Sequence, residues 1–561
     1  MSDSMIRPLP ELPEIDVRDL QDRDAQRFPR LDDDMARRIV GYGREEFVSA
    51  GTLLFERGQR GVDFFFVLEG GIQVFDLDAQ NSPRPVTTHG PGQFSGEMDH
   101  FNQRRILVSG LAAAPTRLIR ISREQFRRLV SAETDIGEII MRAFILRRVG
   151  LIRLGGGGVV LIGPAHAAHT LRLQRFLVRN GFPHRLLDSE SEGDALEWVR
   201  HFDITPEQLP VIVTPDRGLL KNPSTGELAD QLGLTEAIEP GRVHDVAVVG
   251  AGPSGLAAAV YAASEGLDTI VIEGMAPGGQ AGTSSRIENY LGFPTGISGQ
   301  ALAGRAQAQA QKFGARLAIS RHVTGIDCSE RPYRLVLEGG QVIEARSIVV
   351  ATGARYRKLD VPDYERFEGQ GIHYAATPME AQLCRNEEII VVGGGNSAGQ
   401  AAVFLSRIAA HVHLLVRADG LAATMSDYLV QRIEQSSRIS LHARTRITGL
   451  AGDDRLRTVT WQQHTDATVQ TRHIGNVFVM VGAEPNTDWL AGCLRLDAKG
   501  FVCTGPEAGN FGAASAYATS KPAIFAVGDV RAGSIKRVAA GVGEGAAVIA
   551  AVHAALNPSP A

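Results

Sequence analysis

Residues 244–263 read HDVAVVGAGPSGLAAAVYAA and decide the fold of the second half of the chain. The apolar run Val246–Val249 predicts a buried strand, and the alanine-rich stretch after Gly255 predicts a helix. Between them, Gly250-x-Gly252-x-x-Gly255 has the spacing with which a strand–turn–helix unit binds a dinucleotide. The next apolar strand ends at Glu273, 23 positions after Gly250. The stretch therefore predicts a parallel α/β domain with a dinucleotide at its first turn.

Each residue of this first glycine turn has a separate expected role. Gly250 permits the tight turn, Gly252 lets the backbone approach a pyrophosphate, and Gly255 lets the helix pack on the strand. The helix start offers unpaired N–H groups and a positive dipole to the phosphates. The carboxylate at the end of the next strand is placed to accept from ribose hydroxyls. The predicted binding residues are Gly250, Gly252, Pro253, Ser254, Gly255 and Glu273.

A second glycine turn follows in residues 387–405, EEIIVVGGGNSAGQAAVFL, 143 positions after the first. This separation allows each turn its own domain. The next strand ends at Val416 and is followed by Arg417 instead of a carboxylate, which favours a 2′-phosphate and hence NADPH over NADH. The alternative for Arg417 is an exposed charge at a strand end. The predicted residues are Gly393, Gly395, Asn396, Ser397, Ala398 and Arg417.

The region of about 243–556 resembles the low-molecular-weight thioredoxin reductase family. The matching stretches, in order, are PGGQ (277–280), IENYLGFP (287–294), ATGA (351–354), FVMVGAEPNT (478–487) and IFAVGDV (524–530). The resemblance implies FAD, a homodimer, an FAD-binding domain split over 243–361 and 488–556, and an NAD(P)H-binding domain over 362–487. It also assigns Gly279, Gln280, Asn289, Gly353, Gly528 and Asp529 to the FAD site, with Asn289 near the ring and Asp529 at the ribitol.

One segment departs from this family pattern. Thioredoxin reductases carry a redox dithiol just before the second glycine turn, and the corresponding segment here, GIHYAATPMEAQLC (371–384), has Ala375 and Pro378 at the two cysteine positions. Neither side chain can form the thiolate that disulfide exchange requires. Thr377 and Glu380 instead predict a capped helix start with proline at its first position. Cys384, six residues later, is expected to be a buried structural cysteine, the alternative being a lone redox thiol.

Short strands with glycine turns over 31–150 predict a small antiparallel roll followed by a helix. The predicted strands lie in TLLFE (52–56), VDFFFVLEGGIQVFDL (62–77), ILVSGLAA (106–113) and TRLIRIS (116–122). Within it, GQFSGEMDHFNQRRILVSG (92–110) resembles the phosphate-binding cassette of cyclic-nucleotide-binding domains. The resemblance implies that Gly96, Glu97 and Arg105 hold a cyclic nucleotide, with Arg104 as the alternative cation. Ile106 stands where that pattern has a hydroxyl residue, so a roll used only for packing stays open as the alternative. The polar residues 1–30 are expected to be a mobile leader and not a signal peptide.

Residues 157–235 alternate between strands and helices, with helices expected over about 167–180 and near 193–202, which predicts a small separate α/β domain. Its order and the pair Leu209-Pro210, where a cis-proline is expected, resemble a thioredoxin or glutaredoxin-like domain. The position for a CxxC motif reads GPAHAAHT (163–170) and holds no cysteine. We expect a docking or scaffold module, the alternative being an unrelated α/β linker domain.

Composition narrows the remaining function classes. The 561 residues include 58 Lys and Arg against 63 Asp and Glu, a net charge of −5 without the basic face of nucleic-acid or membrane-surface binders. The four cysteines form no CxxC, so we expect neither a disulfide scaffold nor a zinc site. The apolar stretches contain turn glycines, which predicts no membrane span, and we expect a cytoplasmic protein.

The sequence therefore predicts a multidomain α/β protein: a cyclic-nucleotide-binding β-roll, a thioredoxin-like α/β domain without CxxC, and two Rossmann-like domains of thioredoxin reductase type. The expected function is an FAD-dependent NADPH oxidoreductase with a cyclic nucleotide as effector and no metal. The electron acceptor stays open among ferredoxin, a quinone, oxygen and a thiol protein. A ferredoxin–NADP reductase-like enzyme and a nucleotide-sensing switch with little turnover are the alternatives.

Overall fold

The computed structural model describes residues 25–557 apart from 78–82, 97, 102–103, 155–157, 192–203, 216–217, 285–286, 288, 375, 377, 422–424, 454, 465–467, 491 and 510–514. The chain divides into two compact units. The first runs to Val159 and includes 183–185 and 213–218, and the second contains the remainder. The expected helix near 193–202 and Glu97 lie outside the described residues.

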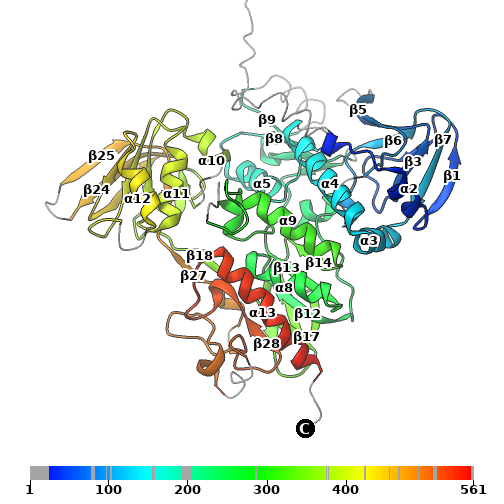
Figure 1. Ribbon diagram of the computed structural model, residues 1–561. Coiled ribbons are helices and arrows are strands. Elements are labelled where there is room, and N and C mark those ends of the chain that lie inside the picture. Colours follow the sequence, from blue (N-terminus) through cyan, green and yellow to red (C-terminus); the bar gives the residue numbers. More distant parts are fainter. Residues whose placement is uncertain are drawn as a thin grey trace, which may run out of the picture. The chain divides into compact units, whose positions relative to one another are not determined.

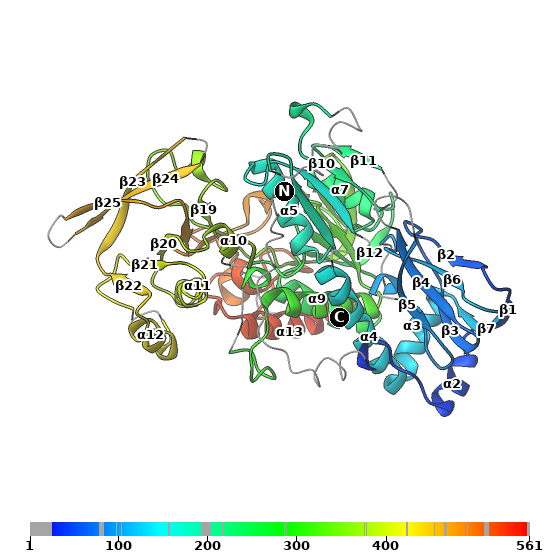
Figure 2. The same ribbon diagram turned by 90° about the horizontal axis from the view of Figure 1, so that it is seen from above.

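The first unit is an antiparallel roll of two sheets (Figure 2). One sheet has the order β1-β7-β3 and the other β2-β6-β4-β5. The strands are β1 (Arg44–Val48), β2 (Leu53–Phe55), β3 (Phe64–Glu69), β4 (Ile72–Leu77), β5 (Pro83–His89), β6 (Ser109–Ala112) and β7 (Thr116–Ile121). The roll agrees with the predicted class, but sequence patterning missed β1 and β5 because REEFV and PRPVTTH are largely exposed and polar.

Helices pack against the roll through a core that is rich in phenylalanine. The helices are α2 (Asp33–Val40), η1 (Met98–Phe101), α3 (Arg123–Ala132) and α4 (Thr134–Leu154). Phe64, Phe94, Phe126 and Phe144 are fully buried. Their rings stack or make edge-to-face contacts, with the centroids of Phe64 and Phe126 4.8 Å apart. This aromatic core packs α3 and α4 against the roll.

Residues 159–232 form a small α/β domain, which we call the middle domain; most of it, including α5 and α7, belongs to the second unit. Its sheet has the order β11-β10-β8-β9, from β8 (Val159–Gly163), β9 (His184–Asp188), β10 (Val211–Val213) and β11 (Leu219–Lys221). Its helices are η2 (Pro206–Gln208), α5 (Ala168–Arg179) and α7 (Thr225–Leu232). The Leu209–Pro210 bond is cis, as expected.

A larger domain, the β12 domain, is built on a sheet of order β14-β13-β12-β17-β16-β15 with β28 beside β17. Its strands are β12 (Val243–Val249), β13 (Thr269–Glu273), β14 (Arg316–Ile319), β15 (Val323–Asp327), β16 (Tyr333–Leu337), β17 (Val342–Val350) and β28 (Ile524–Ala526). Strands β12, β13, β14, β17 and β28 are parallel, and β15 and β16 are antiparallel additions. The helices are α8 (Pro253–Ser264), α9 (Gly299–Lys312) and α13 (Val538–Leu556), with the short turns η3 (Ala281–Thr283), η5 (Asp488–Leu490), η6 (Gly505–Ala508) and η8 (Gly528–Val530).

The second glycine turn belongs to another parallel sheet, in what we call the β20 domain. Its order is β19-β26-β20-β21-β22, from β19 (Ile372–His373), β20 (Glu388–Val392), β21 (His411–Leu415), β22 (Ile439–His442) and β26 (Val477–Val479). The helices are α10 (Pro378–Leu383), α11 (Asn396–Leu405) and α12 (Asp427–Glu434), and η4 (Glu365–Phe367) precedes β19. A three-stranded antiparallel sheet, β23 (Thr445–Gly452), β24 (Leu456–Gln463) and β25 (Val469–His473), supplies Trp461 to its core.

The chain leaves the β12 domain through β18 (Ala354–Tyr356) and returns through β27 (Ala483–Pro485). These two strands pair with each other. Among the described residues, α13 alone has the length and apolar composition that a membrane crossing needs. It lies along α8 and buries Gly541, Gly545 and Val548 (Figure 1). Its sequence, VAAGVGEGAAVIAAVHAAL, was not singled out by the patterning above.

The structure corrects one expectation about the cysteines. Cys328 and Cys493, 165 positions apart, are joined by a disulfide at one edge of the β12 domain core. Cysteine spacing could not reveal this pair, because the bond depends on β15 lying beside η5. Cys384 and Cys503 are free and buried.

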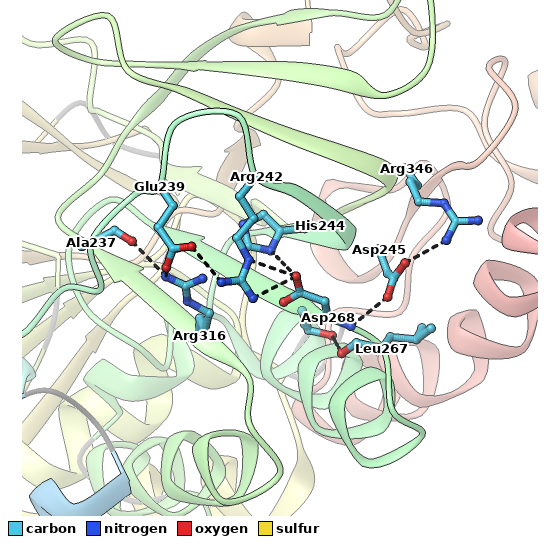
Figure 3. Close-up of polar contacts among 10 residues, drawn as sticks. Ala237, Glu239, Arg242, His244, Asp245, Leu267, Asp268, Arg316 and Arg346 are labelled. Atoms are coloured by element: carbon cyan, nitrogen blue, oxygen red, sulfur yellow. Dashed lines mark hydrogen bonds and ion pairs between the residues drawn. The ribbon is translucent and has the colours of Figure 1, made fainter. Parts of the chain in front are cut away.

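The segment that enters β12 is fixed by a group of ion pairs (Figure 3). The Glu239 carboxylate forms ion pairs with Arg242 and Arg316, each with a nitrogen–oxygen distance of 2.9 Å. The Asp268 carboxylate pairs with Arg242 at 3.1 Å and lies 3.2 Å from the Nδ1 of His244, a ring whose pKa is lowered by burial. Exposed ion pairs are worth little singly, but these share partners, and a network holds its geometry better than isolated pairs do. The segment between the middle domain and the β12 domain is therefore attached to β13 and β14.

Candidate nucleotide sites

The first glycine turn connects β12 to α8, and each glycine there has a different physical reason. Gly250 has φ +104°, and a Cβ on it would lie 2.4 Å from the Ala351 carbonyl oxygen. A Cβ on Gly255 would lie 1.9 Å from the Gly250 carbonyl oxygen. Gly252 is different, because it is the N-cap of α8 and has an extended conformation. A Cβ on Gly252 would have the Gly279 Cα, 4.0 Å away, as its nearest neighbour. The open space before Gly252 and the uncapped helix start fit a pyrophosphate.

Ser254 explains why further glycines surround this turn. A Cβ on Gly528 would lie 2.3 Å from the Ser254 Oγ, and one on Gly541 would lie 2.5 Å from the same atom. The start of α8 therefore packs directly on η8 and α13. Asp529 lies in η8, mostly buried, and burial is the main cause that raises its pKa. The structure thus brings Ser254, Gly528 and Asp529 beside the first turn.

Glu273 ends β13 at the same edge of the sheet. One carboxylate oxygen accepts from the Ala251 N–H at 2.8 Å, and the other accepts from the Met275 N–H at 3.0 Å. The carboxylate therefore fixes the backbone of the glycine turn. This structural role was not foreseen from the sequence.

The remaining residues assigned to the flavin occupy neighbouring loops. Gly279 has φ +53° and its carbonyl accepts from Arg179, while the Gln280 amide donates to the Ala354 carbonyl next to Gly353. Asn289 lies in an exposed bend. The structure places Gly279, Gln280 and Gly353 near the first turn, because a Cβ on Gly279 would lie 3.1 Å from the Gly252 Cα.

The second glycine turn connects β20 to α11 and repeats this geometry. Gly393 has φ +141°, and a Cβ on it would lie 2.3 Å from the Met480 carbonyl oxygen. Gly395 caps α11 in an extended conformation, with no described heavy atom within 4 Å of its Cβ position. Ala398 is fully buried under the turn. This cradle fits a second dinucleotide diphosphate, which the N–H groups at the start of α11 would receive.

Three further residues predicted for the second site differ in their contacts and exposure. The Asn396 Oδ1 accepts from the Ser426 N–H at 2.7 Å, which ties the helix start to the segment before α12. Ser397 is exposed. Arg417 is exposed two residues after the end of β21, where its guanidinium is accessible to a ligand phosphate.

The segment at the dithiol position starts a helix. Pro378 is the first residue of α10, whereas Ala375 and Thr377 lie outside the described residues. Glu380, expected to bond back to the helix start, has its Oε1 3.6 Å from the Arg175 Nε of the middle domain. Cys384 is fully buried, and burial raises the pKa of its thiol to about 12. A thiol that stays protonated at neutral pH is a poor nucleophile.

A cavity of about 70 Å³ lies inside the first unit, and the sequence missed several of its lining residues. Arg27, Phe28, His89 and Arg147 line it together with Gly96. The Arg147 Nη1 donates to the Gly96 carbonyl at 2.8 Å, and its guanidinium lies 4.8 Å from the Phe94 ring centroid. Burial lowers the pKa of His89 to about 3, so its imidazole is neutral. These residues come from the leading segment, β5 and α4, and no motif links them.

Of the residues predicted for the phosphate-binding cassette, the structure describes Gly96, Arg104 and Arg105. Gly96 has φ +123°, and a Cβ on it would meet the His100 ring at 2.7 Å. The Arg105 Nη1 donates to the Gly58 carbonyl at 3.1 Å. Arg104, the alternative cation, is 7% exposed. The Gly58 loop and the cassette thus lie side by side, as an isolated bridge between Arg60 and Arg105 also indicates.

Comparisons with known proteins agree with both halves of this description. The pyridine nucleotide-disulphide oxidoreductase model matches residues 244–545, more than half of the chain, and the cyclic nucleotide-binding domain model matches 45–133. Thioredoxin reductase of Escherichia coli O157:H7 is 35% identical over 291 residues, which is 50% of this chain and 87% of that protein. Thioredoxin reductase of Mycolicibacterium smegmatis is 33% identical over 305 residues, 54% of this chain and 94% of that protein.

Solved structures give the same result for the fold. Thioredoxin reductase of Lactococcus lactis (FR conformation) has a TM-score of 0.51 and 29% identity, covering 56% of this chain and 99% of that one. The T. acidophilum enzyme has a TM-score of 0.51 and 25% identity, covering 56% and 100%. The predicted resemblance to thioredoxin reductases, the N-terminal cyclic nucleotide-binding domain and the multidomain α/β fold class are confirmed. The chain therefore belongs to the pyridine nucleotide-disulphide oxidoreductase family, as an FAD-dependent NAD(P)H oxidoreductase with an N-terminal cyclic nucleotide-binding domain.

Proposed function

We propose that the chain oxidises NADPH with FAD and delivers the electrons to an acceptor without using a protein dithiol. The observation that carries the proposal is the pair of open cradles at Gly252 and Gly395, combined with Pro378 at the start of α10. When bound, FAD takes a hydride from the nicotinamide and passes electrons onward, and that chemistry belongs to the cofactors.

The residues of the chain bind and orient these groups. The N–H groups at the start of α8 would receive the FAD pyrophosphate, and Asp529 would bind the ribitol hydroxyls. The N–H groups at the start of α11 receive the NADPH diphosphate. The side chain of Pro378 offers no sulfur for onward transfer, and Cys384 is buried with a protonated thiol. The Cys328–Cys493 disulfide packs against the core of the β12 domain, where it serves as a structural link.

Because Pro378 offers no thiol and Cys384 is buried, the acceptor would have to approach the bound FAD itself. Ferredoxin, a quinone, oxygen and a thiol protein are the acceptor classes to test, and the proposed form is a cytoplasmic homodimer. The test mixes the anaerobic holoprotein with NADPH and follows flavin absorbance. Bleaching within seconds supports the enzyme; no change over minutes rejects it in favour of a sensor with little turnover. An acceptor screen with and without cyclic nucleotide then identifies the acceptor.

The 2′-phosphate preference is tested at Arg417. Arg417→Ala removes the exposed guanidinium next to the proposed adenosine site, so KM for NADPH is expected to rise about tenfold while KM for NADH stays unchanged. Arg407→Ala, at an exposed position after α11, is the control and should change neither value. Equal effects on NADPH and NADH would mean that Arg417 does not contact the 2′-phosphate.

We further propose that a cyclic nucleotide in the first unit regulates the enzyme. Arg105 would bind the cyclic phosphate, since a guanidinium matches its paired oxygens. Arg105→Ala is therefore expected to abolish any change in NADPH oxidation caused by cyclic AMP or cyclic GMP, and to weaken binding of the nucleotide by at least tenfold in calorimetry. Arg117→Ala, whose side chain is 45% exposed and pairs with Glu45 and Glu69, should respond like wild type. A full response in Arg105→Ala refutes the assignment.

A further inference from the structure

Helix α5 of the middle domain carries arginines at positions 172, 175 and 179. Residues three and four apart lie on one face of a helix, so these side chains form one basic stripe. Both views show α5 beside α9 of the β12 domain and α10 of the β20 domain (Figures 1 and 2). The stripe therefore lies where three domains of the second unit meet.

The end of α5 is attached to the predicted flavin loop. The Arg179 Nη2 donates to the Gly279 carbonyl at 2.8 Å, and the Asn180 Nδ2 donates to the Met275 carbonyl at 3.2 Å. In return, the Gln300 amide at the start of α9 donates to the Val178 carbonyl. These three hydrogen bonds run in both directions between the end of α5 and the β12 domain. They therefore hold α5 in one position on that domain.

Other contacts fix the middle domain to the β12 domain independently of α5. The Arg321 Nη2 pairs with the Asp230 Oδ1 at 2.6 Å, and the Ser320 Oγ donates to the Thr225 Oγ1 at 3.0 Å. The connecting segment is held by the ion pairs around Glu239 (Figure 3). The middle domain and the β12 domain therefore form one platform.

Arg175 reaches from this platform to the β20 domain. Its Nη2 lies 3.4 Å from the His373 Nδ1, and its Nε lies 3.6 Å from the Glu380 Oε1. The Glu380 side chain is only 6% exposed and His373 is 2% exposed, whereas the Arg175 side chain is 31% exposed, so water is excluded from the acceptor side of both contacts. A guanidinium beside a shielded carboxylate interacts more strongly than an exposed pair does.

Burial sets the protonation state of His373, and its hydrogen bonds set which ring nitrogen carries the proton. Burial lowers its pKa to about 4, so the ring is neutral at pH 7. Because arginine can only donate, the Nδ1 accepts, and the Nε2–H donates to the Asn476 Oδ1 at 2.9 Å. Asn476 in turn donates to Glu387 at 3.0 Å. Arg175 therefore starts a directed chain of hydrogen bonds that enters the β20 domain between β19 and β26.

We propose that α5 positions the β20 domain relative to the β12 domain, with Arg175 as the positioning residue for hydride transfer. The polypeptide connects these domains through β18 and β27, a narrow two-stranded link. A further contact from a fixed platform restricts their relative orientation. This inference rests on the proposed function. It also gives the cysteine-free middle domain a role, which is to contact α10 and the neighbouring strand β19 through Arg175.

The physical consequence concerns the rate and not the affinity. Hydride transfer needs the nicotinamide and the flavin ring held in one geometry, and a misplacement of 1 Å can cost up to about 100-fold. Without Arg175 the β20 domain samples more orientations, while the turn at Gly395 still binds NADPH. The limiting rate of flavin reduction should fall, and the dissociation constant should not change.

The experiment compares Arg175→Ala with Arg172→Ala in the full-length holoprotein. Arg172 lies on the same stripe but donates to the Pro223 carbonyl of its own domain, at 2.9 Å. In anaerobic stopped-flow measurements, Arg175→Ala should lower the limiting rate of flavin reduction about 5- to 20-fold, with FAD content and NADPH dissociation constant within twofold of wild type. Arg172→Ala should match wild type. Arg175→Lys keeps the charge opposite Glu380 and should recover part of the rate.

Each other result overturns the inference. An unchanged or faster rate in Arg175→Ala shows that the contact does not position the domain productively. An equal loss in Arg172→Ala shows a general effect on the helix, and a loss of FAD shows a structural effect. If Arg175→Ala fails to fold, Arg175→Lys decides by the same rate criterion. Wild-type protein that NADPH does not reduce contradicts the proposed function itself, and the inference with it.

Discussion

Gly252→Asp is expected to yield a folded protein that contains almost no FAD. Gly252 has φ −68° and ψ −178° at the N-cap of α8, a conformation open to any residue, and its Cβ position has no described neighbour closer than 4.0 Å. Aspartate is a favoured N-cap, so α8 should form as before. Its carboxylate, however, fills the cradle and repels the pyrophosphate. We expect the affinity for FAD to fall by at least about 100-fold, roughly 3 kcal/mol.

The measurement is the flavin-to-protein ratio of the purified variant, read from its absorption spectrum, with circular dichroism to establish folding. Gly304→Ala is the control, because Gly304 lies in α9 with open space around it and the change should leave the flavin content unchanged. Gly252→Ser adds a neutral cap of similar size and should retain more flavin than the aspartate. A yellow Gly252→Asp protein with wild-type flavin content would show that this turn does not hold the pyrophosphate.

Gly395→Asp is expected to separate the two nucleotide sites. Gly395 caps α11 with φ −95° and ψ 178°, and its Cβ position is open, so the helix should again tolerate the change. The carboxylate should exclude the NADPH diphosphate by the same repulsion. The variant should stay yellow, bleach normally with dithionite, and lose at least about 100-fold in apparent affinity for NADPH.

The two variants serve as controls for each other. Gly252→Asp should lose the flavin, whereas Gly395→Asp should keep it and lose its reduction by NADPH. Gly395→Ala, which adds a small uncharged group, should retain more of the NADPH affinity than the aspartate does. If Gly395→Asp is reduced by NADPH at wild-type concentrations, the second dinucleotide is bound elsewhere.

The two glycine turns could be predicted because their requirements are local. Gly250 and Gly393 adopt positive φ within a few residues of the strand that precedes them. The cradle at each helix start follows from the same short segment. A strand, a turn and a helix in immediate succession leave few alternative structures, so the spacing of the glycines carries most of the information.

Residues that depend on distant segments could not be predicted in this way. Arg175 meets His373 across 198 positions, and Cys328 meets Cys493 across 165 positions. The residues around the cavity of the first unit, such as Arg27 and His89, come from separate elements. Strands β1 and β5 lack an apolar pattern because they expose most of their side chains, so pairing with β7 and β4 defines them.

The sequence by itself determined that a cyclic nucleotide-binding domain precedes an oxidoreductase region, that two glycine turns lead into helices, and that positions 375 and 378 carry no sulfur, because each is written in contiguous segments. Only the tertiary structure decided that Glu273 secures the first glycine turn, and that α5 contacts both the Gly279 loop and α10. Such contacts arise when elements that are distant in the sequence pack together. Packing depends on the shape and burial of whole surfaces, which residues adjacent in the sequence do not specify.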